Sequence, residues 1–204
     1  MKKISIDLDW TLFDLEPIIK SAFKGSREKY TRQKFFLIQD CYSPEIVKKL
    51  ERLLNSKLFY ETPLLDQKIP DILNRVYFSG QYNVNYVTDR SLYSLDEYFL
   101  ENQTINEGLE KNLDKTIKQL INSKIPCNKE NVFELKMRKI EVLKKIKSEL
   151  HFDDAPHIIE SCQKNGIPCV MISNDKTLYN HFLRDKVKWY PNMVAALQSE
   201  CPVE

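Results

Sequence analysis

The stretch of residues 4–14, ISIDLDWTLFD, decides how this chain folds. It opens with a short apolar run typical of a β-strand. Carboxylates collect where that strand ends, at Asp7, Asp9 and Asp14. Crowded carboxylates raise one another's pKa and ionise together only beside a compensating cation. Taken alone the stretch also fits a solvated turn, so the rest of the chain has to decide between a turn and a site.

The composition indicates a globular protein with a real core. The chain has 204 residues, which fit one domain, or one domain with a large insertion. Hydrophobic residues make up 42%, including ten Phe and ten Tyr. The 31 basic and 29 acidic residues leave a net charge of +2, which argues against nucleic-acid binding by bulk electrostatics. A local basic patch stays open.

Several classes of protein are disfavoured by what the sequence lacks. The five cysteines have irregular spacing and form no zinc pattern, which indicates free thiols. No apolar run approaches the roughly 20 residues of a membrane span, and the first apolar run stops at Asp7, too early for a signal peptide. Neither glycine-rich nucleotide loop is present. We therefore expect a soluble cytoplasmic protein without a membrane partner.

Strands alternate with helices along the chain, which predicts an α/β fold with a mostly parallel sheet covered on both faces. Helical spacing is clearest over 43–56, where Ser43 is a candidate N-cap, and over 136–150, where Leu150 continues the apolar stripe. Gly166 suits a helix end. The segment 91–112 is ambiguous between a second cover and a loop. The remaining expected elements are strands at 3–8, 81–88, 149–156 and 167–175, helices at 70–78, 113–124 and 157–166, and a short last element at 186–193.

Polar side chains follow each expected strand. In parallel sheets ligands bind at the carboxyl ends of strands, so these side chains are expected to converge. They are Asp7 and Asp9, Thr88, Asp153 and Asp154, and Ser173, Asn174 and Asp175. Thr88 alone fits an ordinary strand-end cap, and Asn174 and Asp175 alone fit a turn.

The motifs at these strand ends resemble those of the haloacid dehalogenase-like (HAD) superfamily of aspartate-nucleophile phosphatases. DLDWT at 7–11 resembles the DxDxT signature, and Thr88 in YVTDR follows in the second motif's place. Lys139 in KIEVLKKIK resembles the lysine motif, with Lys136 as the alternative, and HFDDAP supplies the acidic pair. The resemblance runs from residue 4 to about residue 175 and implies a Rossmann-like three-layer sheet.

The residue types also define a chemistry of their own. Hard carboxylate oxygens suit Mg²⁺, which shares its coordination with substrate phosphate. Asp7 is expected to attack phosphorus and form an aspartyl-phosphate, with Asp9 exchanging a proton with the leaving group and then with water. Lys139 offsets the negative charge and Thr88 holds a phosphate oxygen. Any lysine in that lysine-rich helix also fits a solvated position.

The resemblance adds finer expectations at the site. It implies that backbone N–H groups around Leu8 and Asp9 hold the phosphate, and that Asp7 and the Asp9 carbonyl bind the metal. It also implies that one residue of the pair Asp153 and Asp154 binds the metal directly, and we favour Asp154.

Residues 15–68 are too long for an ordinary loop and are expected to form a small helical cap over a core of 1–14 and 69–204. The segment resembles the cap of 5′-deoxynucleotidase-like members. Cations and aromatics of SREKYTRQKFF (26–36) either line the pocket or, as we favour, form cap core and solvated surface. Trp10, Phe13 and Arg90 are expected to contact substrate, although an arginine at 90 also fits a surface position. Trp10 stands where many family members have glycine.

These expectations combine into a magnesium-dependent phosphomonoester hydrolase acting on a small phosphorylated metabolite, such as a (deoxy)nucleoside 5′-monophosphate. One alternative is a polynucleotide-end (3′) phosphatase, with nucleic acid as a possible but disfavoured partner. The other is a non-catalytic HAD-like binding or regulatory protein. The oligomeric state is left open.

Overall fold

The structure is a computed structural model that describes residues 1–30, 42–90, 105–134, 138–173 and 186–203, with only the backbone described over 105–111. None of the helices in this part of the chain combines the length and apolar character that a membrane crossing needs.

Six parallel strands form one sheet in the order β3-β2-β1-β4-β5-β6. The predicted parallel α/β architecture is therefore confirmed. Strand β3 was not predicted, because three residues with a charged end carry too little periodicity to be recognised. The strands are β1 (Lys2–Ile6), β2 (Tyr82–Thr88), β3 (Val132–Glu134), β4 (Leu150–Asp153), β5 (Cys169–Ile172) and β6 (Lys188–Tyr190).

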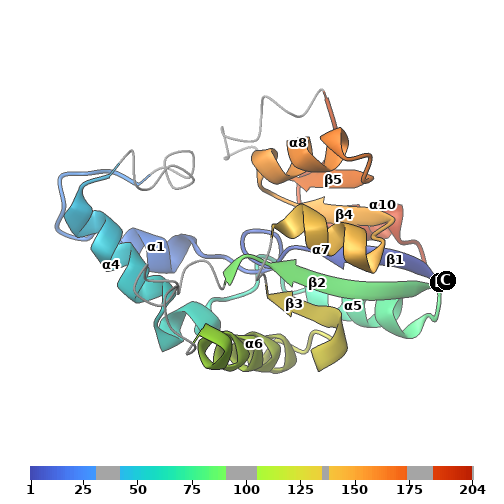
Figure 1. Cartoon of the computed structure of the whole chain (residues 1–204), viewed down its shortest axis with the longest axis horizontal. Helices are drawn as coiled ribbons and strands as arrows, with labels where there is room; N and C mark the ends of the chain where they lie inside the picture. Colours follow the sequence, from blue (N-terminus) through green and yellow to red (C-terminus); the bar gives the residue numbers. More distant parts are fainter. Residues whose placement is uncertain (31–41, 91–104, 135–137, 174–185, 204) are drawn as a thin grey trace.

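Helices cover both faces of the sheet, which gives three layers (Figure 1). Alternation along the strands supplies both cores, since Ile4 and Ile6 of β1 pack into one and Val87 of β2 into the other. The first face carries α5 (Ile69–Phe78), α6 (Ile105–Asn122) and α10 (Met193–Glu200), and the second carries α7 (Lys139–Ile146) and α8 (Pro156–Lys164).

The strand order places a switch point between β1 and β4. From β1 the chain moves outward through β2 to β3, and it then returns to β4 on the other side of β1. At such a point the flanking connections leave in opposite directions and open a crevice beyond the carboxyl ends of the strands. The residues that follow β1 and β4 therefore meet at this crevice.

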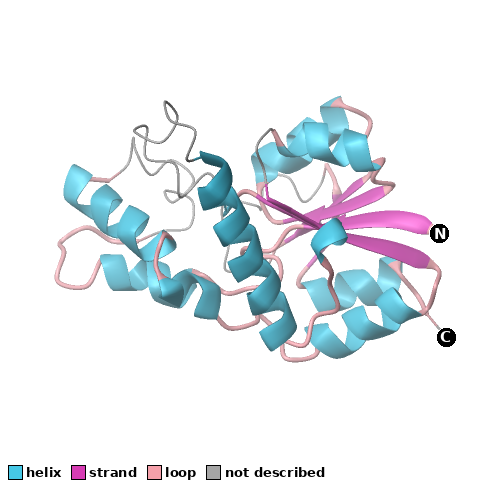
Figure 2. Cartoon of the chain, turned by 60° about the horizontal axis from the view of Figure 1, so that its bottom comes forward, coloured by secondary structure: helices cyan, strands magenta, loops and turns pink. Residues whose placement is uncertain are grey.

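The segment after β1 folds as a helical cap with its own core. It contains α1 (Glu16–Ala22), α4 (Pro44–Leu54) and the 3₁₀ helix η1 (Lys57–Glu61), and it lies beside the sheet with α6 between the two (Figures 1 and 2). The segment that enters the cap pairs with the segment that leaves it. The Asp14 N–H donates to the Pro63 carbonyl and the Leu65 N–H donates to the Leu12 carbonyl, both at 2.8 Å. The predicted cap is thus present and joined to the core through paired backbone.

Several local predictions need correction or lie outside the described residues. Helix α7 ends at Ile146 because Lys147 adopts φ +57°, so Leu150 belongs to β4 and not to a helix. Ser43 stands at the N-cap position of α4 as predicted, but its hydroxyl donates to Glu28 and makes no capping hydrogen bond to the helix. Gly166 has the predicted left-handed conformation, with φ +66°. The later part of the ambiguous segment is the start of α6, while 91–104 lie outside the described residues.

Candidate active site

The loop after β1 is held tightly by its own backbone. The Asp7 N–H donates to the Phe152 carbonyl of β4 at 2.9 Å, and the Leu8 carbonyl accepts from the N–H groups of Leu12 and Phe13. This turn requires a left-handed residue, which is Trp10 at φ +58°. Because non-glycine residues disfavour that region, the loop carries backbone strain at its tip.

Three carboxylates gather at the switch point. One oxygen from each of Asp7, Asp153 and Asp154 lies within 4.8 Å of the others, and all three residues are buried. Asp7 follows β1, while the pair closes β4, so the sheet brings together groups separated by more than 140 positions. Burial raises the pKa of Asp7 well above its usual range, with Lys139 opposing this and the neighbouring acids reinforcing it.

Lys139 lies against this group from the first position of α7. Its Nζ donates to Asp7 Oδ1 at 2.8 Å and to Asp153 Oδ2 at 2.9 Å, and it is 3.4 Å from Asp89 Oδ2. Burial by itself would lower the pKa of the ammonium, but the three carboxylates outweigh burial and raise it well above its usual range. Lys136, the alternative, lies outside the described residues.

Both carboxylate oxygens of Asp153 are engaged by groups of the protein. Oδ1 accepts from the Ala155 N–H at 2.8 Å, and Oδ2 accepts from Lys139 and lies 3.0 Å from His151 Nε2. Burial raises the pKa of Asp153, but the Lys139 ammonium and the His151 hydrogen bond outweigh this and hold it well below its usual range. The imidazole Nδ1 of His151 is in turn 2.9 Å from the Ser5 hydroxyl.

The role of His151 was missed in the sequence. Strand alternation places residues two apart on one face, so His151 and Asp153 share a face, and that was the available signal.

Two buried threonines follow neighbouring strands, Thr88 at the end of β2 and Thr11 in the loop after β1. The Thr88 Oγ1 is buried at the end of β2, and it has no hydrogen-bond partner among the described residues. An orphaned buried hydroxyl is costly unless a ligand or water completes it. The Thr11 hydroxyl donates to Asp7 Oδ2 at 3.3 Å and reaches Asp154 Oδ1 at 3.5 Å.

Asp9 does not join the other carboxylates and pairs with Arg90 instead. Arg90 Nε lies 3.1 Å from Asp9 Oδ1 and 3.0 Å from Oδ2, and Nη2 donates to Oδ1 at 2.6 Å. Arg90 is 1% exposed. Burial would lower the pKa of this guanidinium, but Asp9 outweighs burial and raises it. Among the described residues, the side chains placed to hold a metal ion are therefore those of Asp7, Asp153 and Asp154, without that of Asp9.

The other predicted substrate contacts are buried in the two cores. Phe13 is fully buried in the core beneath the sheet, as is Leu8, while Trp10 packs with the helices of the cap. Of the cations and aromatics of this run, Arg27 and Lys29 are exposed and the Tyr30 ring packs on Phe23, while residues 31–36 lie outside the described residues.

The end of β5 is described only in part. Ser173 is buried, while Asn174 and Asp175 lie outside the described residues.

Two further polar residues near the site were missed. Glu134 ends β3 beside Thr88 and accepts a hydrogen bond from the Thr116 hydroxyl of α6. Burial is the main reason that the pKa of Glu134 is raised to about 7. Gln119, also on α6, accepts from Arg90 Nη1 at 2.5 Å. Neither residue lies in a recognisable motif, so the sequence carried no signal for them.

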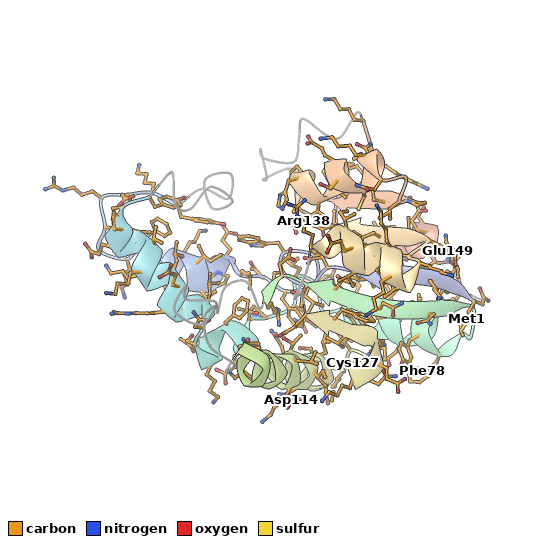
Figure 3. All side chains as sticks on the ribbon, in the orientation of Figure 1. Met1, Phe78, Asp114, Cys127, Arg138 and Glu149 are labelled. Carbon is orange, nitrogen blue, oxygen red and sulfur yellow. The ribbon has the colours of Figure 1, made fainter. Side chains whose placement is uncertain are left out.

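The donor set fits a hard divalent cation. Buried oxygen ligands with a surplus of negative charge are what Mg²⁺ and similar ions bind. Burial raises the pKa of Asp7 although Lys139 opposes it, so Lys139 alone does not offset the burial of the Asp7 carboxylate. Figure 3 shows Arg138, next to Lys139, on the side of the core that faces the cap, with Met1 on the opposite side. The site therefore lies on the cap side of the sheet.

Comparison with known proteins finds similarity in structure alone. No family model matches the chain. No curated protein sequence matches it. The solved structure of CbbY from Rhodobacter sphaeroides in complex with phosphate has a TM-score of 0.58 and 14% identity, covering 97% of this chain and 96% of CbbY. A CbbY mutant in complex with xylulose-(1,5)bisphosphate has a TM-score of 0.57 and 13% identity, covering 95% of both chains.

A HAD hydrolase of family IA, variant 3, from Entamoeba histolytica has a TM-score of 0.53 and 12% identity, covering 96% of this chain and 95% of that protein. At these identities the likeness is one of fold, and it extends over the sheet and the cap together.

Proposed function

From its HAD-like fold and its site, we propose that this protein is a magnesium-dependent phosphomonoester hydrolase with Asp7 as nucleophile. The observation that carries the proposal is the buried group of Asp7, Asp153 and Asp154 around Lys139 at the switch point. The Thr88 hydroxyl ends β2, the neighbour of β1, and has no hydrogen-bond partner in the described part of the chain, which supports a place for one more oxygen-bearing ligand. A tetrahedral phosphate supplies such oxygens.

The nucleophilic step uses the position of Asp7. A carboxylate oxygen of Asp7 attacks phosphorus, a new P–O bond forms, and the bond from phosphorus to the leaving oxygen breaks with its electron pair going to that oxygen. Lys139 stays within hydrogen-bond distance of Asp7 Oδ1, at 2.8 Å, and orients the carboxylate while offsetting its charge. Thr88 donates its hydroxyl hydrogen to a phosphate oxygen.

Proton transfer falls to Asp9. Its carboxyl gives a proton to the leaving oxygen as the first bond breaks. In the second step it takes a proton from the water that attacks the phosphorus of the aspartyl-phosphate. That step releases inorganic phosphate and restores Asp7. Asp9 lies two residues from the nucleophile on the same loop, which supports this division of work.

Asp7 and Asp154, with the Asp9 carbonyl, would hold Mg²⁺, and Asp153 would orient Lys139. This division follows from Asp153 having both oxygens engaged by Lys139, His151 and the Ala155 N–H. When bound, the cation would neutralise phosphate charge so that the anionic nucleophile can approach.

A small phosphate ester is the substrate class that we propose. The fold neighbours from R. sphaeroides are described with phosphate and with a sugar bisphosphate, which supports this class. Within it, a (deoxy)nucleoside 5′-monophosphate is our more specific prediction, and the cytoplasm is the compartment in which we expect the reaction.

The test is hydrolysis of p-nitrophenyl phosphate with and without Mg²⁺, followed by a panel of nucleoside monophosphates, sugar phosphates and a 3′-phosphorylated oligonucleotide. Asp7→Asn is expected to abolish turnover. Asp14→Asn is the matched control, because Asp14 lies in the same stretch, accepts from the Glu16 N–H and stands outside the group of Asp7, Asp153 and Asp154. Equal activity in Asp7→Asn and wild type would refute the nucleophile, and turnover of the oligonucleotide alone would favour polynucleotide ends.

A further inference from the structure

We propose that Arg90 is a positioning residue that holds Asp9 for proton transfer and ties it to the cap, an inference that rests on the proposed hydrolase function. The sequence predicted a substrate contact for Arg90. The contacts of its guanidinium favour a different role, because each of its three nitrogens already has a partner within the protein.

The pairing with Asp9 leaves the two carboxylate oxygens unequal. Oδ1 accepts from both Nε and Nη2 of Arg90, the latter at 2.6 Å. Among the described residues, the one hydrogen bond to Oδ2 comes from the Nε–H, which is shared at 3.0 Å to Oδ2 and 3.1 Å to Oδ1. Oδ1 is therefore the anchored atom, and Oδ2 keeps lone-pair capacity for a further partner. Since a carboxyl group uses one oxygen at a time in proton transfer, Oδ2 is the working atom in this arrangement.

Anchoring also keeps Asp9 apart from its neighbours. Asp9 acts electrostatically on Asp7, yet its carboxylate lies outside the group formed by Asp7, Asp153 and Asp154. Without a cation of its own, Asp9 would be drawn toward Lys139 or toward a metal in that group. Arg90 removes this competition and leaves one carboxylate in place for the leaving group.

The other side of Arg90 is built by the cap and by α6. Nη1 donates to Gln119 Oε1, and Gln119 Nε2 donates to the Thr62 hydroxyl at 3.0 Å, directly after η1. The guanidinium carbon lies 4.9 Å from the centre of the Phe59 ring and 5.8 Å from that of Tyr60, both in η1. A planar, charged group suits this stacking and bidentate pairing, whereas a lysine ammonium does not.

These contacts form one continuous path from the cap to Asp9. Thr62 fixes the position of the Gln119 amide, and the rings of η1 fix the plane of the Arg90 guanidinium. The guanidinium in turn fixes the plane of the Asp9 carboxylate. All of these side chains except Tyr60 are buried, so the path has little freedom to change one end without the other. Removing the fork of Arg90, or its Gln119 partner, should therefore disturb Asp9 while leaving Asp7 and Lys139 in place.

Two aryl esters of similar shape test this role. Phenyl phosphate has a poor leaving group that needs a proton, and p-nitrophenyl phosphate has a good one that does not. The readout is kcat/KM, which covers the steps up to departure of the leaving group and excludes the later hydrolysis of the aspartyl-phosphate. We expect Arg90→Lys to lower kcat/KM for phenyl phosphate at least about tenfold and kcat/KM for p-nitrophenyl phosphate less than about threefold. Asp9→Asn should show the same selective loss, and Arg75→Lys, an exposed arginine on α5, should change neither.

Gln119→Leu is the second variant, because it keeps the ion pair should Arg90→Lys fail to fold. It should show the same selective loss at a smaller size, about threefold. An equal loss on both esters, or no loss on either, would overturn the proposal.

If wild type hydrolyses neither ester, the substrate panel decides the proposed hydrolase function separately, and crystal structures of wild type and Gln119→Leu decide the positioning role. A turned Asp9 carboxylate supports it, and an unchanged one contradicts it.

Discussion

At Trp10 the backbone is strained while the side chain is well packed. Substitutions there measure both effects as changes in the free energy of unfolding. The Trp10 φ of +58° costs about 1–2 kcal/mol for a residue with a β-carbon. Its side chain is 5% exposed and packs in the cap core, and truncating such a residue costs about 3–5 kcal/mol. Trp10→Gly loses the packing, relieves the strain and adds about 0.4–1 kcal/mol of freedom to the unfolded chain, so the free energy of unfolding should fall by about 1–5 kcal/mol.

The comparison with Trp10→Ala isolates the backbone contribution. Alanine loses nearly the same packing but keeps the left-handed cost. Glycine is favoured by the strain that it relieves and disfavoured by about 0.4–1 kcal/mol for the greater freedom of its unfolded chain. With about 1.5 kcal/mol of strain relieved against about 0.7 kcal/mol of added chain freedom, Trp10→Gly should be more stable than Trp10→Ala by about 0.8 kcal/mol, the reverse of the order at ordinary positions.

Urea unfolding followed by circular dichroism measures both variants at one pH. Ala22→Gly, at a buried position in the same cap, is the control for the ordinary order, and glycine should be the less stable residue there. If Trp10→Ala proves as stable as Trp10→Gly, or more stable, the reasoning from the left-handed loop is refuted. If neither variant is less stable than wild type, the assignment of Trp10 to the cap core is wrong.

Three further predictions concern the charged groups. Lys139→Met leaves buried Asp7 and Asp153 without their cation, so the free energy of unfolding in EDTA should fall by about 3–5 kcal/mol, with partial recovery in Mg²⁺; unchanged urea midpoints would contradict the pairing. Because the pKa of Glu134 is raised to about 7, the folded state holds the proton of this carboxyl more tightly than the unfolded state. The stability that this adds is fully present below pH 4.5 and is lost as the pH rises through 7. Glu134→Gln should flatten this loss, at most about 3 kcal/mol, in thermal melts across that range, and an unchanged slope counts against it. His151→Leu should weaken Mn²⁺ binding, measured by electron paramagnetic resonance, about tenfold or more, while His151→Gln keeps a donor for Asp153 and loses less; equal losses would contradict positioning.

Much of the site could be predicted because its residues follow recognisable strands. The apolar runs before Asp7 and before Asp153 and Asp154 each predict a strand, and parallel strands bring their carboxyl ends to one edge. Lys139 was selected by its place in a motif, and the structure places its Nζ between Asp7 and Asp153. The main residues of the site could therefore be predicted from short-range patterns, because each lies at the end of a strand or at the start of a helix that is recognisable by itself.

Other parts of the site could not be read locally. The pairing of Asp9 with Arg90 joins residues 81 positions apart. Its extension to Gln119 depends on how α6 lies against the cap. Strand β3 has only three residues, and it is recognisable through its pairing with β2.

By itself the sequence determined the α/β class, the helical character of the cap and the group of acids at the strand ends, because strand alternation and helical spacing are properties of neighbouring residues. The tertiary structure alone decided what each polar group contacts. In the structure Trp10 packs in the cap core, Asp153 lies within hydrogen-bond distance of His151, and Asp9 pairs with Arg90. These pairings depend on which surfaces meet when the sheet, α6 and the cap pack together, and no periodicity along the chain records that meeting.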